Sequence, residues 1–240
     1  MLNLFRQKPL TTGTGEGLKP GASHYRAYVG PPGDYDLVSA MVFNLLTCVG
    51  LRQHHRVLDI GCGSLRIGRL LIPYLNPGNY IGIEPNQWLV RDGILNEVGQ
   101  DMIRLKKPEF SYRDNLDDFT KPLHINYAIA QSIFSHCSRE IIRQWLCQAS
   151  RHLADDGVLF ATFISREADF DGRGWVYPDC VGYTPATMAK LAAEGGLGFE
   201  VIDWRHPRQT WAAFYKPGYQ KPWAEGQPIS WNRIVDMGKP

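Results

Sequence analysis

The sequence lacks the cysteine spacing that metal clusters and disulfide-rich scaffolds need. Its five cysteines are odd in number, and no two of them are spaced as C-x-x-C. Zinc sites and disulfide frameworks depend on regularly spaced cysteines. We therefore expect no metal site, and thiols that stay free in a reducing, cytoplasmic environment.

Long apolar runs are also missing. No segment approaches the roughly 20 consecutive apolar residues that span a membrane. The first residues lack the apolar stretch of a signal peptide. We expect a cytoplasmic chain with no membrane partner.

Neither sign of charge is in excess. Lysine and arginine number 26, and aspartate and glutamate number 24. The chain therefore lacks the overall basic surplus typical of nucleic-acid-binding proteins, and no DNA partner is indicated. A net balance does not describe local patches, and the sequence does not specify an oligomeric state.

What the sequence does contain is an alternation of strand-like and helix-like segments. Helical spacing of apolar residues predicts helices over 34–49, 65–74, 86–98 and 138–153. Short apolar runs predict strands at 56–60, 80–83, 109–112, 127–131 and 157–164. This order predicts an α/β fold whose parallel sheet is covered by helices on both faces.

The last part of the pattern differs. Thr184-Pro185 predicts a helix start, and the helix is expected to end near Gly195-Gly196. Two strand-like runs follow at 199–204 and 210–215, separated only by 205–209. So short a connection predicts an antiparallel pair, and hence one antiparallel strand at an edge of the sheet.

Composition divides the chain into three parts. Residues 1–33 are rich in Gly, Thr and Pro and are expected to form an N-terminal arm or lid. Residues 34–216 carry the alternating pattern, and residues 217–240 form a tail containing Pro and Trp.

The most informative segment is a strand that runs into a glycine turn and then a helix. Gly61 and Gly63 follow an apolar strand, and Asp59 precedes them by two positions. Glycine permits a tight turn and close approach of a ligand to the backbone. The helix that follows offers free N–H groups to that ligand.

Two further residues narrow the ligand class. A dinucleotide-binding G-x-G-x-x-G motif would need glycine at position 66, where the chain has Arg66. An acid at Asp59 suits a cationic ligand, or orders the turn through backbone N–H groups, better than it suits a pyrophosphate. Glu84 ends the next strand, 21 positions after Gly63, where a carboxylate accepts hydrogen bonds from ribose hydroxyls.

These residues resemble the class I S-adenosylmethionine-dependent methyltransferases. Asp59-Ile60-Gly61-Cys62-Gly63 matches the family's D/E-x-G-x-G motif, Glu84 matches its ribose-binding acid, and the segment 130–136 resembles its fourth strand. The resemblance covers roughly residues 35–216. It implies a Rossmann-like, seven-stranded, mostly parallel sheet with helices on both faces and one antiparallel edge strand.

The resemblance also implies S-adenosyl-L-methionine as the cofactor and a set of cofactor contacts. These are Asp59, Gly61, Cys62, Gly63, Arg66, Glu84, Pro85, Asp114, Asn115, Gln131, Ser132 and Tyr28. The chain departs from many family members at Leu65, where a further glycine is common. Arg66 then faces a carboxylate or a substrate anion, or else lies on the surface of the first helical turn.

Three features are candidates for the acceptor side. His136 follows the fourth strand and is the candidate general base, with a structural hydrogen bond as the alternative role. The connection 166–183 is long, and such loops are often functional; its Asp169 and Trp175 are candidates for shaping an acceptor pocket. Tyr25 and Tyr28 in the arm are candidates for covering the cofactor.

No motif fixes the acceptor. The chain has neither N/D-P-P-Y/F, used for amino groups of bases, nor a Pro-Cys nucleophile. We expect methyl transfer to an oxygen of a small molecule or sugar. One alternative is a protein or RNA acceptor. A second is an inactive cofactor-binding module that docks on a protein partner through Trp223 and Trp231. A third is an NAD-dependent oxidoreductase, which Arg66 in place of the motif's glycine disfavours.

Overall fold

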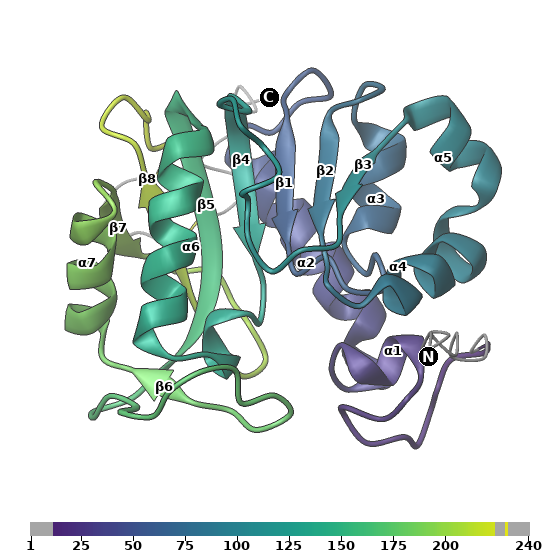
Figure 1. The fold of residues 1–240 in the computed structure, drawn as a ribbon, viewed down its shortest axis with the longest axis horizontal. Helices are drawn as coiled ribbons and strands as arrows, with labels where there is room; N and C mark the ends of the chain where they lie inside the picture. Colours follow the sequence, from purple (N-terminus) through teal and green to yellow (C-terminus); the bar gives the residue numbers. More distant parts are fainter. Residues whose placement is uncertain (1–11, 224–228, 230–240) are drawn as a thin grey trace, which may run out of the picture.

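The computed structural model describes residues 12–223 and residue 229. Their core is one sheet in which the strand order is β3-β2-β1-β4-β5-β8-β7, with β6 paired to β5 outside this path (Figure 1). The strands are β1 (Val57–Ile60), β2 (Tyr80–Ile83), β3 (Glu109–Ser111), β4 (Ile125–Ala130), β5 (Leu153–Ser165), β6 (Gly182–Tyr183), β7 (Gly198–Val201) and β8 (Thr210–Tyr215).

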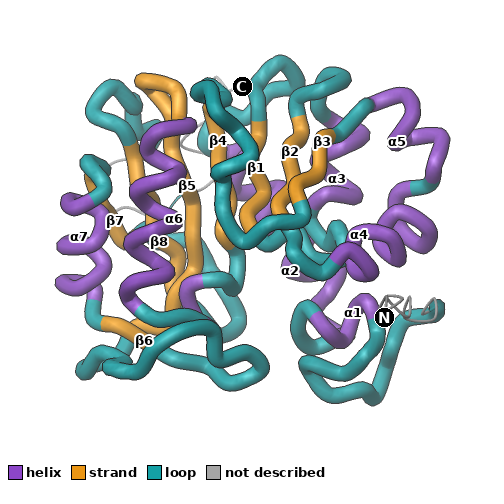
Figure 2. The backbone as a smooth tube through the Cα atoms, in the orientation of Figure 1, coloured by secondary structure: helices purple, strands orange, loops and turns teal. Residues whose placement is uncertain are grey.

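Helices cover both faces of this sheet. The α-helices are α1 (Tyr25–Tyr28), α2 (Tyr35–Cys48), α3 (Gly68–Tyr74), α4 (Gln87–Gly93), α5 (Gln100–Lys106), α6 (Arg139–His152) and α7 (Pro185–Glu194). Short 3-10 turns are η1 (Pro32–Asp34) and η3 (Phe134–His136), and a π-helical segment, η2 (Ile94–Val98), continues α4. Figure 2 shows α6 and α7 side by side, with α1 and β6 at one common end of the sheet.

The two cores follow from the strand pleat. Successive side chains of a strand point to opposite faces. Leu58 and Ile60 therefore join α6 and α7 in one apolar cluster, whereas Val57 joins α2 and α3 in the other. Asp59 lies on the same face of β1 as Val57 and is almost completely buried.

The predicted sheet is confirmed, with one correction. Strand β8 runs antiparallel to both neighbours, but it lies between β5 and β7 and not at the edge. After α7 the chain forms β7 at the edge of the sheet, one strand position away from β5. The following hairpin then returns β8 into the gap beside β5.

Two helical details also differ from the sequence pattern. Leu65 has φ +60°, so the glycine turn continues through it and α3 begins only at Gly68. Helix α5 was not predicted. Gly99 separates it from the π-helical segment, and none of its residues is fully buried.

The N-terminal part of the described chain is folded against the sheet. Helix α1 begins after His24, whose side chain accepts the Arg26 N–H at 3.2 Å. Tyr25 and Ala27 are buried. Residues 1–11 of the expected arm and most of the expected tail, with Trp231, lie outside the described residues. Within the described residues, no helix has the length and apolarity needed to cross a membrane.

Candidate active site

The glycine turn at the end of β1 is fixed by backbone hydrogen bonds to β2. The N–H groups of Gly61 and Cys62 both donate to the Ile83 carbonyl, at 2.8 and 3.0 Å. Gly61 and Gly63 have φ of +68° and +55°, in the left-handed region. A Cβ at Gly61 would lie 2.1 Å from Ile133 Cδ1, so this position requires glycine for both reasons.

Glu84, the predicted ribose-binding acid, lies directly against this turn. Its Oε2 accepts the Gly63 N–H at 3.2 Å, and its Oε1 accepts the backbone and side-chain N–H groups of Asn86, each at 2.8 Å. Burial raises the pKa of Glu84, opposed by these N–H donors. Three donors leave about one acceptor position of the carboxylate, on Oε2, for a ligand.

Asp59 is oriented away from the N–H groups of the turn. Its Oδ2 accepts the Tyr80 hydroxyl at 2.7 Å, inside the α2–α3 core. Burial raises the pKa of Asp59 to about 6, although the Tyr80 bond acts in the opposite direction. Of the two roles considered for Asp59, the ordering of the turn through its N–H groups is not seen, because Ile83 and Glu84 accept the N–H groups of residues 61–63. Cys62 is buried nearby, and burial holds the pKa of its thiol well above the ordinary value.

Arg66 is buried and not on the surface, with 8% of its area exposed. Its guanidinium donates to the Val29 carbonyl at 3.0 Å and to the side-chain oxygen of Gln131. None of the described residues brings a carboxylate into contact with it. Burial lowers the pKa of Arg66 to about 10, with longer-range opposition from Asp59 and Tyr35.

Gln131 and Ser132 follow β4, which lies on the other side of β1 from β2 and Glu84. The Gln131 amide lies 3.2 Å from a ring nitrogen of His206 and donates to the Ser132 hydroxyl at 2.6 Å. Ser132 also accepts from Gln209 at 2.9 Å. His206 and Gln209 belong to the β7–β8 hairpin, so this end of the site is closed by a segment that the sequence pattern indicated only as a turn.

Within the expected N-terminal arm and the turn that follows it, residues 24–34 lie over the glycine turn. The name arm is used below for residues 24–34 alone. Val29 lies so near Gly63 that a Cβ there would be 2.7 Å from Val29 Cγ1. Tyr28 contacts the rings of Trp88 and Tyr177, at centroid distances of 5.2 and 5.3 Å. Burial raises the pKa of Tyr28, with a smaller contribution from the charge of Glu84. The role of Tyr28 in covering a cofactor stays a prediction.

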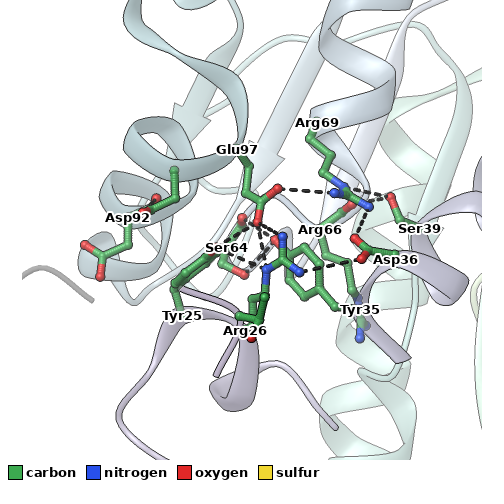
Figure 3. A network of polar contacts seen from close by, with 12 residues as sticks. Tyr25, Arg26, Tyr35, Asp36, Ser39, Ser64, Arg66, Arg69, Asp92 and Glu97 are labelled. Carbon is green, nitrogen blue, oxygen red and sulfur yellow. Dashed lines mark hydrogen bonds and ion pairs between the residues drawn. The ribbon is translucent and has the colours of Figure 1, made fainter. Parts of the chain in front are cut away.

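A buried ion-pair network attaches the arm to the helices (Figure 3). Arg26 contacts Glu97 Oε1 at 2.6 Å, and Arg69 contacts the other Glu97 oxygen at 3.2 Å. The Glu97 side chain is only 6% exposed. Arg26 also lies over the Tyr35 ring, 4.5 Å from its centroid. The network was not anticipated, because its members are spread over more than seventy positions of the sequence.

Three predicted cofactor contacts lie at the β2–β3 end without a distinctive environment. Pro85 and Asp114 are exposed. The hydrogen bonds of Asp114 and Asn115 stay within their own turn, where Asn115 donates to Asp114 at 3.3 Å and accepts the Asp117 N–H at 3.0 Å. Their contact with a cofactor stays a prediction.

His136 ends η3 on the β4 side and is 8% exposed. Its Nδ1 lies 2.7 Å from the Asp179 carbonyl, and its ring is 4.9 Å from that of Tyr177. The long loop predicted to shape a pocket thus packs on His136. The Asp169 carboxylate is engaged at the start of α7, where it accepts the Thr184 N–H at 2.8 Å and the Thr187 hydroxyl; its role in a pocket stays a prediction.

No protein-family model matches the sequence, and no curated protein sequence matches it. Solved structures do. A magnesium protoporphyrin IX methyltransferase from Synechocystis PCC 6803, with bound S-adenosylmethionine, has a TM-score of 0.56 at 14% identity, covering 77% of this chain and 81% of that one. DhpI in complex with S-adenosylhomocysteine has a TM-score of 0.57 at 18% identity, covering 82% and 92%.

The chain has the class I methyltransferase fold. The fold expected from the glycine turn, Glu84 and the alternating elements is thereby confirmed. A third match is the cyclase SpnF, at a TM-score of 0.56 and 16% identity, covering 75% of this chain and 81% of that one. The class I methyltransferase fold therefore does not by itself specify the reaction.

Proposed function

We propose that this protein is an S-adenosyl-L-methionine-dependent methyltransferase that acts on an oxygen of a small molecule. The carrying observation is a pair of complementary groups on either side of the glycine turn. Glu84 keeps an acceptor position beside Gly63, and Arg66 is a buried cation that no carboxylate of residues 12–223 contacts. A buried cation without an anionic partner is costly. S-adenosylmethionine has a ribose diol that can donate to Glu84 and a carboxylate that can pair with Arg66.

The remaining residues support the same assignment. When bound, S-adenosylmethionine supplies a methyl group already activated by its sulfonium. The protein then needs to hold and cover the two reactants. The arm residues Tyr28 and Val29 cover the turn, and the hairpin residues His206 and Gln209 close the β4 side. A small-molecule acceptor agrees with the protoporphyrin methyltransferase among the similar structures. We also propose a cytoplasmic location, which the five free cysteines favour.

The test compares two nucleosides by calorimetry: S-adenosylhomocysteine and methylthioadenosine, which lacks the amino-acid end. Glu84→Ala removes the ribose acceptor, so we expect both ligands to bind roughly 10- to 100-fold more weakly. Arg66→Gln removes the cation, so S-adenosylhomocysteine should weaken by a similar factor while methylthioadenosine is unchanged. Glu109→Ala, at an exposed position of β3, is the matched control.

Equal losses for both ligands in Arg66→Gln would contradict the carboxylate assignment. Absence of S-adenosylhomocysteine binding by the wild-type protein would overturn the proposed function itself. Transfer of a labelled methyl group to a panel of small hydroxyl compounds then separates an active enzyme from the inactive cofactor-binding module.

A further inference from the structure

His136 has one ring nitrogen fixed and the other available. The Asp179 carbonyl can only accept, so Nδ1, at 2.7 Å, carries the proton of the neutral ring. Nε2 then has a lone pair. Within the described part of the chain no atom bonds Nε2, and it is not sealed from solvent. Burial lowers the pKa of His136, which keeps Nε2 unprotonated at neutral pH.

The loop 166–181 holds this ring in a fixed frame. The Val176 N–H donates to the His136 carbonyl at 2.8 Å, and the Val181 N–H donates to the Ser135 carbonyl at 2.8 Å. Cys137 and Trp175 form a β-bridge. These backbone contacts on both sides of His136 give the ring the rigid support that a catalytic group needs.

Two aromatic rings of the loop lie against His136. Tyr177 packs edge-on against it, and Trp175 lies 5.8 Å away by centroids. Trp175 is 52% exposed, so part of its ring surface is free to contact a ligand. On its other side Tyr177 contacts Tyr28, which contacts Trp88. The row of rings therefore connects His136 with the residues that cover Glu84 and the glycine turn.

We propose that Trp175, Tyr177 and His136 form the acceptor site, that the acceptor is a planar aromatic hydroxyl compound, and that His136 Nε2 is its general base. This inference rests on the proposed function. The acceptor O–H proton passes to Nε2, and the oxygen uses the released electron pair to bond the methyl carbon. The sulfur keeps the pair of the broken S–CH3 bond and becomes a neutral thioether, and His136 returns the proton to water.

Other groups near His136 do not compete for this role. The Cys180 thiol lies 3.9 Å from Nδ1, on the fixed side of the ring. Burial raises the pKa of Cys180 and raises that of Tyr177 to about 12, so both stay neutral near pH 7. The Tyr177 hydroxyl is moreover engaged, because it donates to the Tyr28 carbonyl.

The binding test uses 4-ethylphenol and its saturated counterpart 4-ethylcyclohexanol, with protein saturated by S-adenosylhomocysteine. We expect the wild type to bind the phenol at least tenfold more tightly than the cyclohexanol, and Trp175→Ala to abolish that preference. Leu105→Ala, at an exposed site on α5, is the control. Equal binding of the two probes by the wild type would overturn the aromatic site.

The base is tested with His136→Asn, whose amide N–H can replace the Nδ1 donor to Asp179 while Nε2 is lost. Transfer to 4-ethylphenol should fall about 10²- to 10⁴-fold, with the affinity for the phenol changed less than about threefold. Transfer to 4-nitrophenol near pH 8, where that phenol is already ionised, should be almost unaffected.

The pH profile gives a second readout. The wild-type rate should fall as pH drops through the lowered pKa of His136, whereas the His136→Asn rate should rise steadily with pH. Equal slowing with both phenols would mean that His136 is only structural. If S-adenosylhomocysteine binds but no phenol does, the acceptor inference fails and the proposed function stands; if S-adenosylhomocysteine does not bind, both fail.

Discussion

The two halves of the site lie at the same edge of one sheet but are assembled in different ways. The turn half, residues 57–86, is built from neighbouring β1 and β2, and its decisive contact joins Gly63 and Glu84, 21 positions apart. The loop half, residues 131–136 with 166–181, depends on contacts such as His136 with Asp179, 43 positions apart. Residues that are close in the sequence form a recognisable motif, whereas contacts between residues far apart in the sequence are seen only in the folded structure.

The strongest test of the turn half is Gly61→Ala. A Cβ at Gly61 would meet Ile133 at 2.1 Å, and alanine would also be held at a φ of +68°. Backbone strain and overpacking together should lower the free energy of unfolding on the order of 3 kcal/mol or more. Urea denaturation measures it.

Gly196→Ala is the matched control, because Gly196 has φ +70° and nothing lies within 4 Å of its would-be Cβ. There only the strain applies, roughly 1–2 kcal/mol. Equal losses at the two positions would mean that the Ile133 contact between the two halves carries no energy.

The turn half also has an electrostatic cost that depends on pH. Asp59 has its pKa raised from 3.8 to about 6, so the folded chain binds this proton more readily than the unfolded chain. The free energy of unfolding therefore falls as pH rises between these values, by up to about 3 kcal/mol above pH 6. Asp59→Asn should remove that slope and stabilise the protein at neutral pH.

Unfolding curves between pH 4 and pH 8 check this expectation. Tyr80→Phe offers a variant of opposite sign, because it removes the hydroxyl that lowers the pKa of Asp59. Parallel pH profiles for wild type and Asp59→Asn would contradict the assignment of this cost to Asp59.

The smallest expected effect concerns the arm that joins the two halves. Glu97→Gln removes the charge that holds Arg26 and Arg69, and should cost about 1–2 kcal/mol, mostly as faster hydrogen exchange in residues 24–34. Asp101→Asn breaks the exposed pair with Arg104 and should change nothing measurable. Unchanged exchange in Glu97→Gln would mean that other contacts suffice to hold the arm.

Sequence reasoning recovered what periodicity and local motifs encode. The order of the main strands and the reversed β8 follow from apolar spacing and from the short connection before β8. The bond between Glu84 and Gly63 was not predicted, although both residues were candidates for the site. The inserted position of β8 did not follow, because a hairpin pattern does not state on which side of β7 the second strand pairs.

The loop half was only partly predictable. His136 and the long loop were candidates from their positions, but Tyr177 was not, since a single tyrosine in a loop has no periodic signal. The burial of Arg66 was not predictable either, because an arginine at the start of a helix is usually exposed. Its burial comes from Val29 and Gln131, which approach it from 37 and 65 positions away.

The contact between Gly63 and Val29 gives a second reason for glycine at position 63, besides the approach of a ligand. Its lack of a side chain serves the protein's own arm as much as any nucleoside, because Val29 fills the space that a Cβ would take. Positions 63 and 29 are therefore expected to vary together in related chains. A relative without the arm would keep the left-handed backbone at this position, which asparagine tolerates, and would lose the restriction on side-chain size. The arm is therefore one of the reasons why position 63 requires glycine.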